Sequence, residues 1–358
     1  MPAGRYAPSP SGPLHLGNLR TAILAWLYAR HSGRRFLMRV EDLDRVRSGA
    51  EESQLSDLRA LGLDWDGPPV RQSERVEHYA DVVDALVSDG LVYECFCSRR
   101  DIAEATSAPH PDPEAPHSPV PAGSPEAGPD RPAVVLPPGS YPGTCRDLSP
   151  AERERRRRER PAALRIDAAA AAGRPGGPPP AHAVADRLHG MVTAAVDDFV
   201  VRRNDGAYAY NLAVVVDDLA QGIDQVVRGD DLLSSTPRQD WLARLLAPRM
   251  GLVAPATEYV HVPLVLNEAG QRLAKRDGAV TLEDLAALPA GTPGVPDGGW
   301  SPGSVRDLLL DSLGLPPGDL HHALESFDPD GVPSTPWTPP HTLTRPAEGT
   351  PERLRFHR

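Results

Sequence analysis

Cysteine is scarce in this sequence, and no apolar stretch is long enough to cross a bilayer. The 358 residues include three cysteines, an odd number, so a framework of paired disulfides is not expected. A membrane-spanning helix needs about 20 consecutive apolar residues. The start of the chain also lacks the charged and then apolar pattern of an export signal. We therefore expect a cytoplasmic protein that does not bind membranes.

Basic residues are outnumbered by acidic ones. Lysine and arginine total 38 against 49 aspartates and glutamates, which gives a formal net charge of -11. This balance argues against a uniformly basic surface for indiscriminate nucleic-acid binding, although local basic patches remain compatible with it. One such patch is the arginine-dense run 153–160, which a capping box at Ser149 predicts to be helical. A solvated helix face is favoured there over a contact with a nucleic-acid backbone.

Apolar residues make up 40% of the chain, and its length allows a full buried core in two domains or in one domain with additions. Strands are expected at 35–40, 223–227 and 259–266, each followed by polar residues, with helices between the strands. Such repeated units indicate an α/β fold with a parallel sheet. The 41 prolines cluster, which predicts disordered loops at about 106–138 and 168–183 and a largely unstructured tail from 316.

Residues 5–18 read as a short strand, a turn rich in proline and glycine, and the start of a helix. Free N–H groups and the positive end of a helix dipole form an anion site, so a nucleotide phosphate fits this stretch. His15 would add a donor, and Gly17 would leave room for a purine or ribose. The alternative is that His15 only caps the helix.

The whole string 5–18 resembles the "HIGH" region of class I aminoacyl-tRNA synthetases, in particular the glutamyl branch. The resemblance runs from Arg5 to about Leu315 and implies a Rossmann-type catalytic domain with a zinc-bearing insertion. On this basis residues 1–94 and 191–315 are the two halves of the catalytic domain, 95–190 the insertion, and 316–358 a proline-rich tail. A full glutamyl-tRNA synthetase carries a further anticodon-reading domain, and we expect none here.

Binding of free glutamate requires two cationic groups and one acid in a single pocket. Arg5 and Arg228 supply the cations, Glu41 the acid and Tyr210 a hydroxyl, each expected at or near the carboxyl end of a strand. Ordinary surface ion pairs are the alternative for each residue alone, and which arginine would take which carboxylate stays open. The resemblance implies that the amino acid is held by these positions: Arg5, Tyr6, Ala7, Pro8, Ser9, Glu41, Tyr210 and Arg228.

The loop 272–276 resembles the "KMSKS" element, with Lys275 at the position of its second lysine and departures at Arg272 and Ala274. The resemblance implies that His15 and Lys275 are catalytic and stabilise charge on the α-phosphate of ATP, which enters with Mg²⁺. ATP would be bound by His15, Gly17, Asn18 and Lys275. Taken alone, the loop would be no more than a solvated basic turn.

The three cysteines suggest a metal site, since Cys95 and Cys97 end one expected strand and Cys145 follows a long loop. Structural Zn²⁺ takes four ligands, and Tyr141 lies four residues before Cys145. The set Cys95, Cys97, Tyr141 and Cys145 resembles the zinc site of glutamyl-queuosine tRNA(Asp) synthetases, and implies one structural Zn²⁺ per chain. His110 and His117 are alternative fourth ligands, and simple packing of the cysteines is a further alternative.

The resemblance therefore implies an ATP-dependent ligase. We expect a monomer, although the sequence itself does not give the oligomeric state. The enzyme would form glutamyl-adenylate without tRNA and then transfer glutamate to the queuosine base in the anticodon of tRNA(Asp). Two alternatives remain. One is a truncated glutamyl-tRNA synthetase that charges a tRNA 3′ end, and the other is a silent zinc-stabilised binding protein. The silent protein would be expected to have lost His15, Lys275 or the pocket charges, and all are present.

Overall fold

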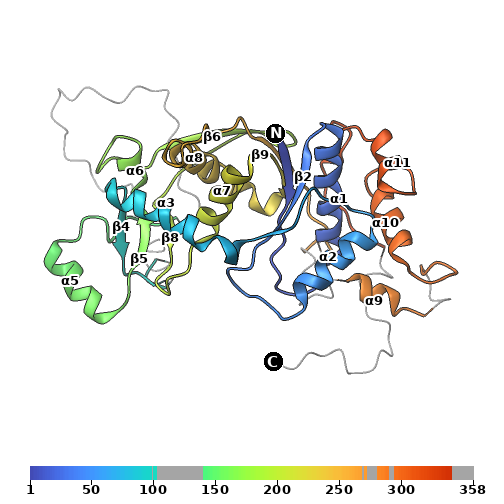
Figure 1. Ribbon diagram of the computed structural model, residues 1–358, viewed down its shortest axis with the longest axis horizontal. Helices are drawn as coiled ribbons and strands as arrows, with labels where there is room; N and C mark the ends of the chain where they lie inside the picture. Colours follow the sequence, from blue (N-terminus) through green and yellow to red (C-terminus); the bar gives the residue numbers. More distant parts are fainter. Residues whose placement is uncertain (99, 103–139, 268–269, 272–279, 290–293, 341–358) are drawn as a thin grey trace, which may run out of the picture.

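A seven-stranded sheet forms the centre of the molecule (Figure 1). The computed structural model describes residues 1–98, 100–102, 140–267, 270–271, 280–289 and 294–340. The strands follow in the order β3 (Val70–Arg71), β2 (Arg35–Val40), β1 (Ala3–Tyr6), β9 (Ile223–Gly229), β10 (Glu258–Val262), β6 (Ala181–Asp186) and β7 (Gly190–Ala195). Each neighbouring pair is parallel except the antiparallel hairpin β6–β7. The predicted α/β fold with a parallel sheet is confirmed.

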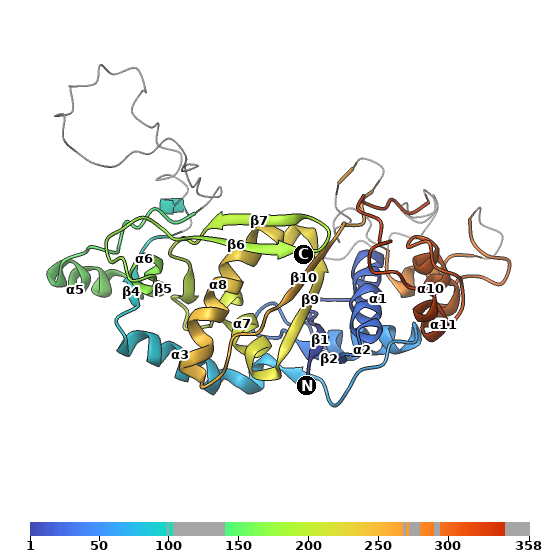
Figure 2. The same cartoon turned by 90° about the horizontal axis from the view of Figure 1, so that it is seen from above.

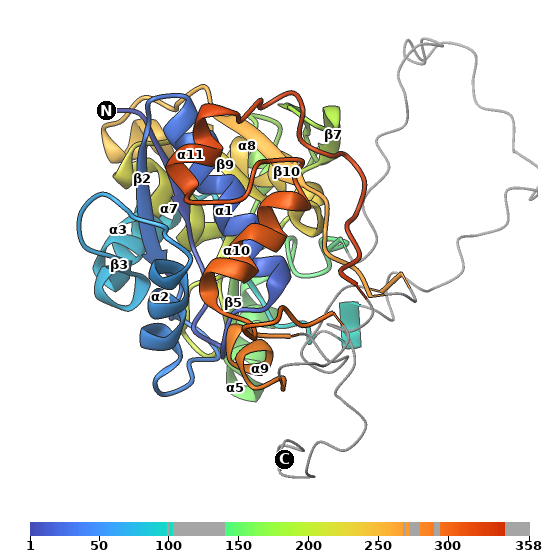
Figure 3. The same ribbon diagram turned by 90° about the vertical axis from the view of Figure 1, so that its right-hand side faces the viewer.

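Helix α1 (Leu16–His31) covers one face of the sheet, because most of its side chains, above all those from Ala22 to Ala29, are apolar and buried. Alternation in β2 turns Phe36 and Met38 towards this face, where they join the same core cluster as α1, while Leu37 joins a cluster on the other side. Outside α1 lie further helices (Figure 3): α2 (Ala50–Ala60), α9 (Leu282–Ala286), α10 (Pro302–Asp311) and α11 (Leu320–Glu325).

The opposite face is covered by α7 (Tyr210–Gln221) and α8 (Thr236–Leu246), with α3 (Val76–Ser88) packed beside them (Figure 1). Helix α7 carries an apolar run from Leu212 to Val216 and ends at Gly222, whose φ of 68° is the left-handed conformation that glycine adopts without strain. The parallel strands therefore lie between two helical layers.

A smaller antiparallel sheet lies at one end of the molecule, as Figure 2 shows. It contains β4 (Val92–Cys95), β5 (Ala163–Ile166) and β8 (Val200–Arg202), and the short helix α6 (Ala168–Ala171) and α5 (Pro150–Glu159) flank it. Ser149 caps α5 by accepting from the Glu152 amide, as predicted. Every described side chain of α5 is at least partly exposed, and Arg157 pairs with Glu94, which favours the solvated-face interpretation.

Two segments predicted to be disordered are ordered instead. Within 168–183, Ala168 and Ala169 are fully buried in α6, and β6 begins at Ala181. The alanine-rich composition suggested disorder, but small side chains allow this segment to pack closely against its neighbours. The other predicted loop, at about 106–138, lies outside the described residues.

The described part of the tail, 316–340, is also ordered. Leu320 and Ala323 of α11 are buried against α1, together with Phe327 and Val332 beyond the helix. The prediction of an unstructured tail is therefore wrong for this stretch, because its few apolar residues match a surface that α1 exposes beyond the sheet. Among the described residues, no helix has the length and apolar character to span a membrane.

Candidate active site and metal centre

Helix α1 begins immediately after His15, whose imidazole caps it. The ring Nδ1 accepts from the amides of Gly17 at 3.1 Å and Asn18 at 3.3 Å, and the Asn18 side chain accepts in turn from the His15 amide. An accepting Nδ1 places the proton of a neutral ring on Nε2, so Nε2 is a donor. The capping interpretation is thus realised, and it orients the ring.

The structure gives a reason for glycine at position 17 that the sequence prediction missed. A Cβ at this position would lie 3.1 Å from ring atoms of His15 and 3.4 Å from Val265. The close approach that requires glycine is therefore made by the capping histidine within the protein itself. A purine or ribose is not needed to explain this residue.

Three predicted pocket residues occupy the ends of three adjacent strands. Arg5 lies in β1, Glu41 directly follows β2, and Arg228 lies near the end of β9. Tyr210 begins α7 above them and is 41% exposed, yet burial of its phenol raises the pKa of Tyr210. The charges of Arg228 and Arg5 oppose this rise while Glu41 adds to it, so all four side chains share one local field.

Two further charged residues complete the cluster, and sequence reasoning missed both. Asp218 of α7 accepts from Arg39 Nη1 at 2.7 Å and from Arg5 Nε at 3.3 Å. Arg39 is fully buried and also lies 3.6 Å from Glu41. Burial opposes its charge, but the carboxylates of Asp218, Glu41 and Asp217 raise the pKa of Arg39. The sequence did contain a sign of both residues. Arg39 is an arginine inside an otherwise apolar strand, and Asp218 belongs to a pair of aspartates inside an otherwise apolar helix.

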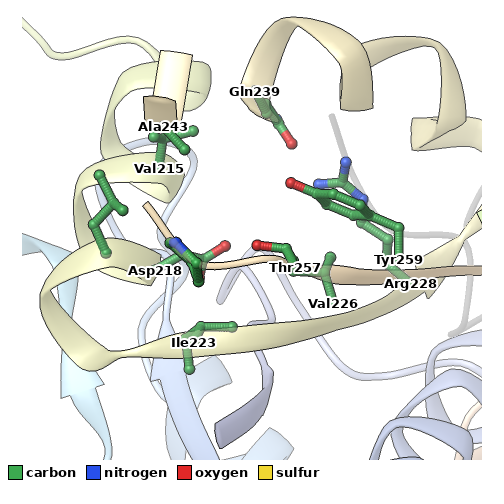
Figure 4. Close-up of a pocket in the computed structure, with 11 residues that line it drawn as sticks. Val215, Asp218, Ile223, Val226, Arg228, Gln239, Ala243, Thr257 and Tyr259 are labelled. Atoms are coloured by element: carbon green, nitrogen blue, oxygen red, sulfur yellow. The ribbon is translucent and has the colours of Figure 1, made fainter. Parts of the chain in front are cut away.

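The buried side chain of His261 accepts a hydrogen bond from Arg228 and positions its guanidinium group. Its Nε donates to His261 Nε2 at 3.0 Å, and its Nη2 donates to the Thr236 hydroxyl at 2.8 Å. The Nδ1 of His261 lies 2.6 Å from Asp186 Oδ2, and this carboxylate also accepts from the backbone amides of Leu188, His189 and His261. The other side of Arg228 lines a cavity of about 20 Å³ with Asp218, Gln239 and Tyr259 (Figure 4), large enough for a water but not for an amino acid.

Lys275 lies outside the described residues, but the chain that follows its loop is anchored at His15. The Leu16 amide donates to the Val280 carbonyl at 3.1 Å, and Thr281 pairs with His15 in an isolated antiparallel bridge. Val280 and Thr281, which follow this segment in the sequence, therefore lie directly beside the start of α1.

The three cysteines converge with Tyr141 in a second cluster, at the end of β4. Their sulfur atoms all lie within 4.8 Å of one another, and those of Cys97 and Cys145 are 3.6 Å apart. The Tyr141 hydroxyl lies 3.4 Å from Cys95 Sγ and 3.6 Å from Cys97 Sγ, and it accepts from the Cys145 amide at 2.9 Å. The group could hold a metal ion. His110 and His117 lie outside the described residues.

Comparison with known proteins agrees with this geometry. The family described as "tRNA synthetases class I (E and Q), catalytic domain" matches residues 3–288. A Glutamyl-Q tRNA(Asp) synthetase of Nocardia farcinica is 56% identical over 94% of this chain and 92% of its own length. One from Cutibacterium acnes is 46% identical over 88% of this chain and 76% of its own length.

A solved glutamate tRNA ligase from Elizabethkingia meningosepticum, in complex with its amino acid, shares the fold. Its TM-score is 0.66 at 24% identity, with 95% of this chain and 67% of that chain covered. The strand ends, the capped α1 and the sequence matches together lead to one assignment. The chain belongs to the class I tRNA synthetases for glutamate and glutamine, and within them to the glutamyl-Q tRNA(Asp) synthetase family.

Proposed function

We propose that this chain activates glutamate with ATP, without tRNA, and transfers it to the queuosine base at the wobble position of the tRNA(Asp) anticodon. The observation that carries the proposal is the gathering of Arg5, Glu41 and Arg228 at three adjacent strand ends, with Tyr210 at the start of α7 in the same local field. Arginines can bind the two carboxylates of glutamate, and Glu41 its ammonium group. The residues Tyr6, Ala7, Pro8 and Ser9 would line the same pocket from the turn after β1.

In the activation step, a carboxylate oxygen of glutamate attacks the α-phosphorus of ATP, and the bond to pyrophosphate breaks. His15, through Nε2, and Lys275 would stabilise the charge that develops on the phosphates, with Gly17 and Asn18 at the helix start. The anchoring of Val280 and Thr281 at His15 and Leu16 supports this placement of Lys275. Mg²⁺ would enter with ATP and neutralise phosphate charge.

In the transfer step, a hydroxyl of the cyclopentene diol of queuosine attacks the acyl carbon of glutamyl-adenylate. An ester forms, AMP leaves, and the hydroxyl proton is lost to solvent. The similarity to two Glutamyl-Q tRNA(Asp) synthetases, over 94% and 88% of this chain, supports this acceptor over a tRNA 3′ end. The reaction would take place in the cytoplasm, and the expectation of a monomer stays a prediction.

The cysteine cluster would hold one structural Zn²⁺ per chain, with Tyr141 as the fourth ligand. Zinc–sulfur bonds of about 2.3 Å and a zinc–oxygen bond of about 2.0 Å imply tetrahedral edges of about 3.8 Å and about 3.5 Å. The 3.6 Å between the sulfurs of Cys97 and Cys145, and the 3.4 Å and 3.6 Å from the phenol oxygen to the sulfurs of Cys95 and Cys97, are close to these values. All three sulfurs lie within 4.8 Å of one another. Burial raises the pKa of Cys97 to about 12, so a bound cation would be needed to hold this side chain as a thiolate. At Cys145 burial also opposes the charge, but hydrogen bonds outweigh it and lower the pKa.

Pyrophosphate exchange tests the activation step. The chain is incubated with ATP, Mg²⁺ and labelled pyrophosphate, with glutamate, aspartate or glutamine, and with or without tRNA. Exchange with glutamate alone, independent of tRNA, is expected. Absence of exchange would favour the silent binding protein, and exchange only with another amino acid would overturn the pocket assignment.

Labelled glutamate tests the acceptor. Three substrates are compared, namely tRNA(Asp) with queuosine, tRNA(Asp) without it, and tRNA(Glu). Labelling of the first alone is expected. Labelling of tRNA(Glu), or of tRNA(Asp) irrespective of queuosine, would favour the truncated glutamyl-tRNA synthetase instead.

A further inference from the structure

A second and larger cavity lies between the metal cluster and the glutamate pocket. Its volume is about 330 Å³, within the range of about 300 to 1,000 Å³ that is typical of small-molecule sites. Tyr141 of the metal cluster lines one part of it, and Tyr210 of the glutamate pocket lines another. Strands β5 and β8 and helices α7 and α8 each supply one further residue of the wall, and the chain just before β8 supplies Asp197 and Phe199. A ligand held here would therefore lie beside the activated amino acid.

The polar wall of this cavity contains one acid and two arginines. Asp197 is 4% exposed, and its Oδ2 accepts from the Tyr141 amide at 3.0 Å while its Oδ1 accepts from Arg238 Nη2. Arg165 is 7% exposed and donates through Nη1 to the Asp198 carbonyl at 2.7 Å. A carboxylate has about four acceptor sites in total, so Asp197 can accept further donors.

Both arginines that line the cavity retain unused hydrogen-bonding capacity. The Nε atoms of Arg165 and Arg238 are buried and have no hydrogen-bond partner among the described residues. An unsatisfied buried donor costs about 1 to 3 kcal/mol. A ligand that brings an acceptor against these guanidinium groups would offset part of that cost after a small shift of the side chains.

The two arginines are held against aromatic rings. Phe199 lines the cavity and is 4% exposed, with the Arg238 guanidinium carbon 5.3 Å from its ring centroid, so a base would stack on the guanidinium planes and not on the buried rings. The Arg165 guanidinium lies 3.8 Å from the centroid of the Tyr141 ring. Unstacked RNA bases are bound in proteins by stacking on aromatic rings and guanidinium planes and by hydrogen bonds to their Watson–Crick edge.

We propose that this cavity receives the nucleobase of the RNA nucleoside that accepts glutamate, and that it recognises a guanine-type Watson–Crick edge. Such an edge presents two adjacent N–H donors, which match Asp197, and one carbonyl acceptor, which matches Arg165 or Arg238. A phosphate matches the wall less well, because it carries no N–H donor for the Asp197 carboxylate. The inference rests on the proposed function and adds the place where the acceptor base binds.

The first test of the base pocket removes a positive charge from its wall by replacing Arg238 with glutamine. The KM for queuosine-containing tRNA(Asp) in the transfer reaction should rise about tenfold or more, as expected for a lost charged hydrogen bond. Pyrophosphate exchange with glutamate and the zinc content should remain at wild-type values. Arg244→Gln is the matched control, because Arg244 lies on the same helix, is paired with Asp240 and does not line the cavity. It should alter none of the three readings.

A second variant tests the space without removing a charge. Val200→Phe places a larger apolar side chain on the wall of the cavity and should also raise the KM for tRNA. In the third arm, free guanosine should raise the apparent KM for tRNA in the wild type, and free uridine should not. These arms together distinguish a base pocket from a general effect of charge.

The outcomes separate the two proposals. If the wild type forms adenylate but labels no tRNA, the proposed function fails and the base pocket fails with it. If the wild type labels queuosine-containing tRNA(Asp) while Arg238→Gln and Val200→Phe both keep the wild-type KM, the function stands and the pocket assignment is overturned. Loss of zinc together with exchange activity in both variants would also overturn it, because the effect would then be structural.

Discussion

The Nε2 atom of His261 accepts a hydrogen bond from Arg228 and so fixes the position of its guanidinium group. We predict that His261→Asn raises the KM for glutamate about tenfold in pyrophosphate exchange, with a smaller change in kcat, because asparagine reaches Asp186 but not Arg228. His261→Gln places an oxygen near the lost Nε2 and should restore most of the affinity. An unchanged KM in a folded His261→Asn protein would show that the histidine does not position Arg228.

The same histidine predicts a pH dependence of stability. Burial and the charge of Arg228 lower the pKa of His261, although the hydrogen bond to Asp186 opposes this, and His189 also lowers it. The unfolded chain binds this proton below about pH 6.5 and the folded chain resists it, so the free energy of unfolding contributed by this site falls as the pH drops below about 6.5.

Urea unfolding at pH 7.5 and 5.5 measures this effect. His261→Gln should lose less stability than the wild type between the two pH values. The comparison must be made as a difference between the proteins, because burial and Glu283 raise the pKa of Asp57 to about 6, which changes stability in the opposite direction. Equal losses in both proteins would contradict the prediction.

Sequence could identify residues whose chemistry matches the substrate, but not those that hold them. Arg5, Glu41 and Arg228 follow from the charges of glutamate and the positions of strand ends, and the structure does bring them together. Their roles remain predictions. Asp218 and Arg39 match no group of the substrate, and their position became evident only when α7 was placed over β1 and β2.

At the scale of elements, the metal cluster joins the end of β4 to the chain before α5. We predict that Cys145→Ser releases one Zn²⁺ per chain and lowers the melting temperature, since structural zinc contributes directly to folding free energy. Metal analysis of freshly purified protein measures the first effect and thermal unfolding the second. Wild-type protein purified without zinc would contradict the assignment.

Tyr141→Phe is the sharper variant of this cluster. It removes the hydroxyl that lies 3.4 Å from Cys95 Sγ but retains the ring that packs against Arg165. Weaker zinc retention under chelator titration is expected. If retention equals that of the wild type, a histidine or a water completes the site in place of the phenolate.

Element types were predictable where periodicity was strong, as in α1, β2, α7 and β9. The prediction of disorder was wrong at 168–171 and 320–325. It was based on composition, which shows that a segment has few large apolar residues. Composition does not show whether the rest of the fold offers a surface against which those few residues can pack. The hairpin β6–β7 was missed for a related reason. Its exposed small residues, such as Ala183 and Ala185, give little apolar alternation.

At the scale of the whole molecule, the chain near residue 327 belongs to the main core. Phe327 is 5% exposed and contacts the rings of Tyr28 and His31 edge-on. Phe327→Ala should lower the free energy of unfolding by about 3 kcal/mol, measured by urea unfolding. Glu325→Ala, an exposed change on α11, is the control. A variant as stable as the wild type would show that this segment is dispensable for the core.

The pairing of β1 with β9 has a consequence for the order of events during synthesis. Ala3 pairs with Ile223, so the middle of the sheet joins strands about 220 residues apart. At about 5 to 20 residues per second, the ribosome adds β9 about 10 to 40 s after β1. During that interval β1 can pair with β2, but its other edge has no partner, and Arg5 has neither Asp218 nor Arg228 nearby. The nascent chain therefore exposes one unpaired edge of β1, an edge that favours aggregation until β9 has been made and pairs with it.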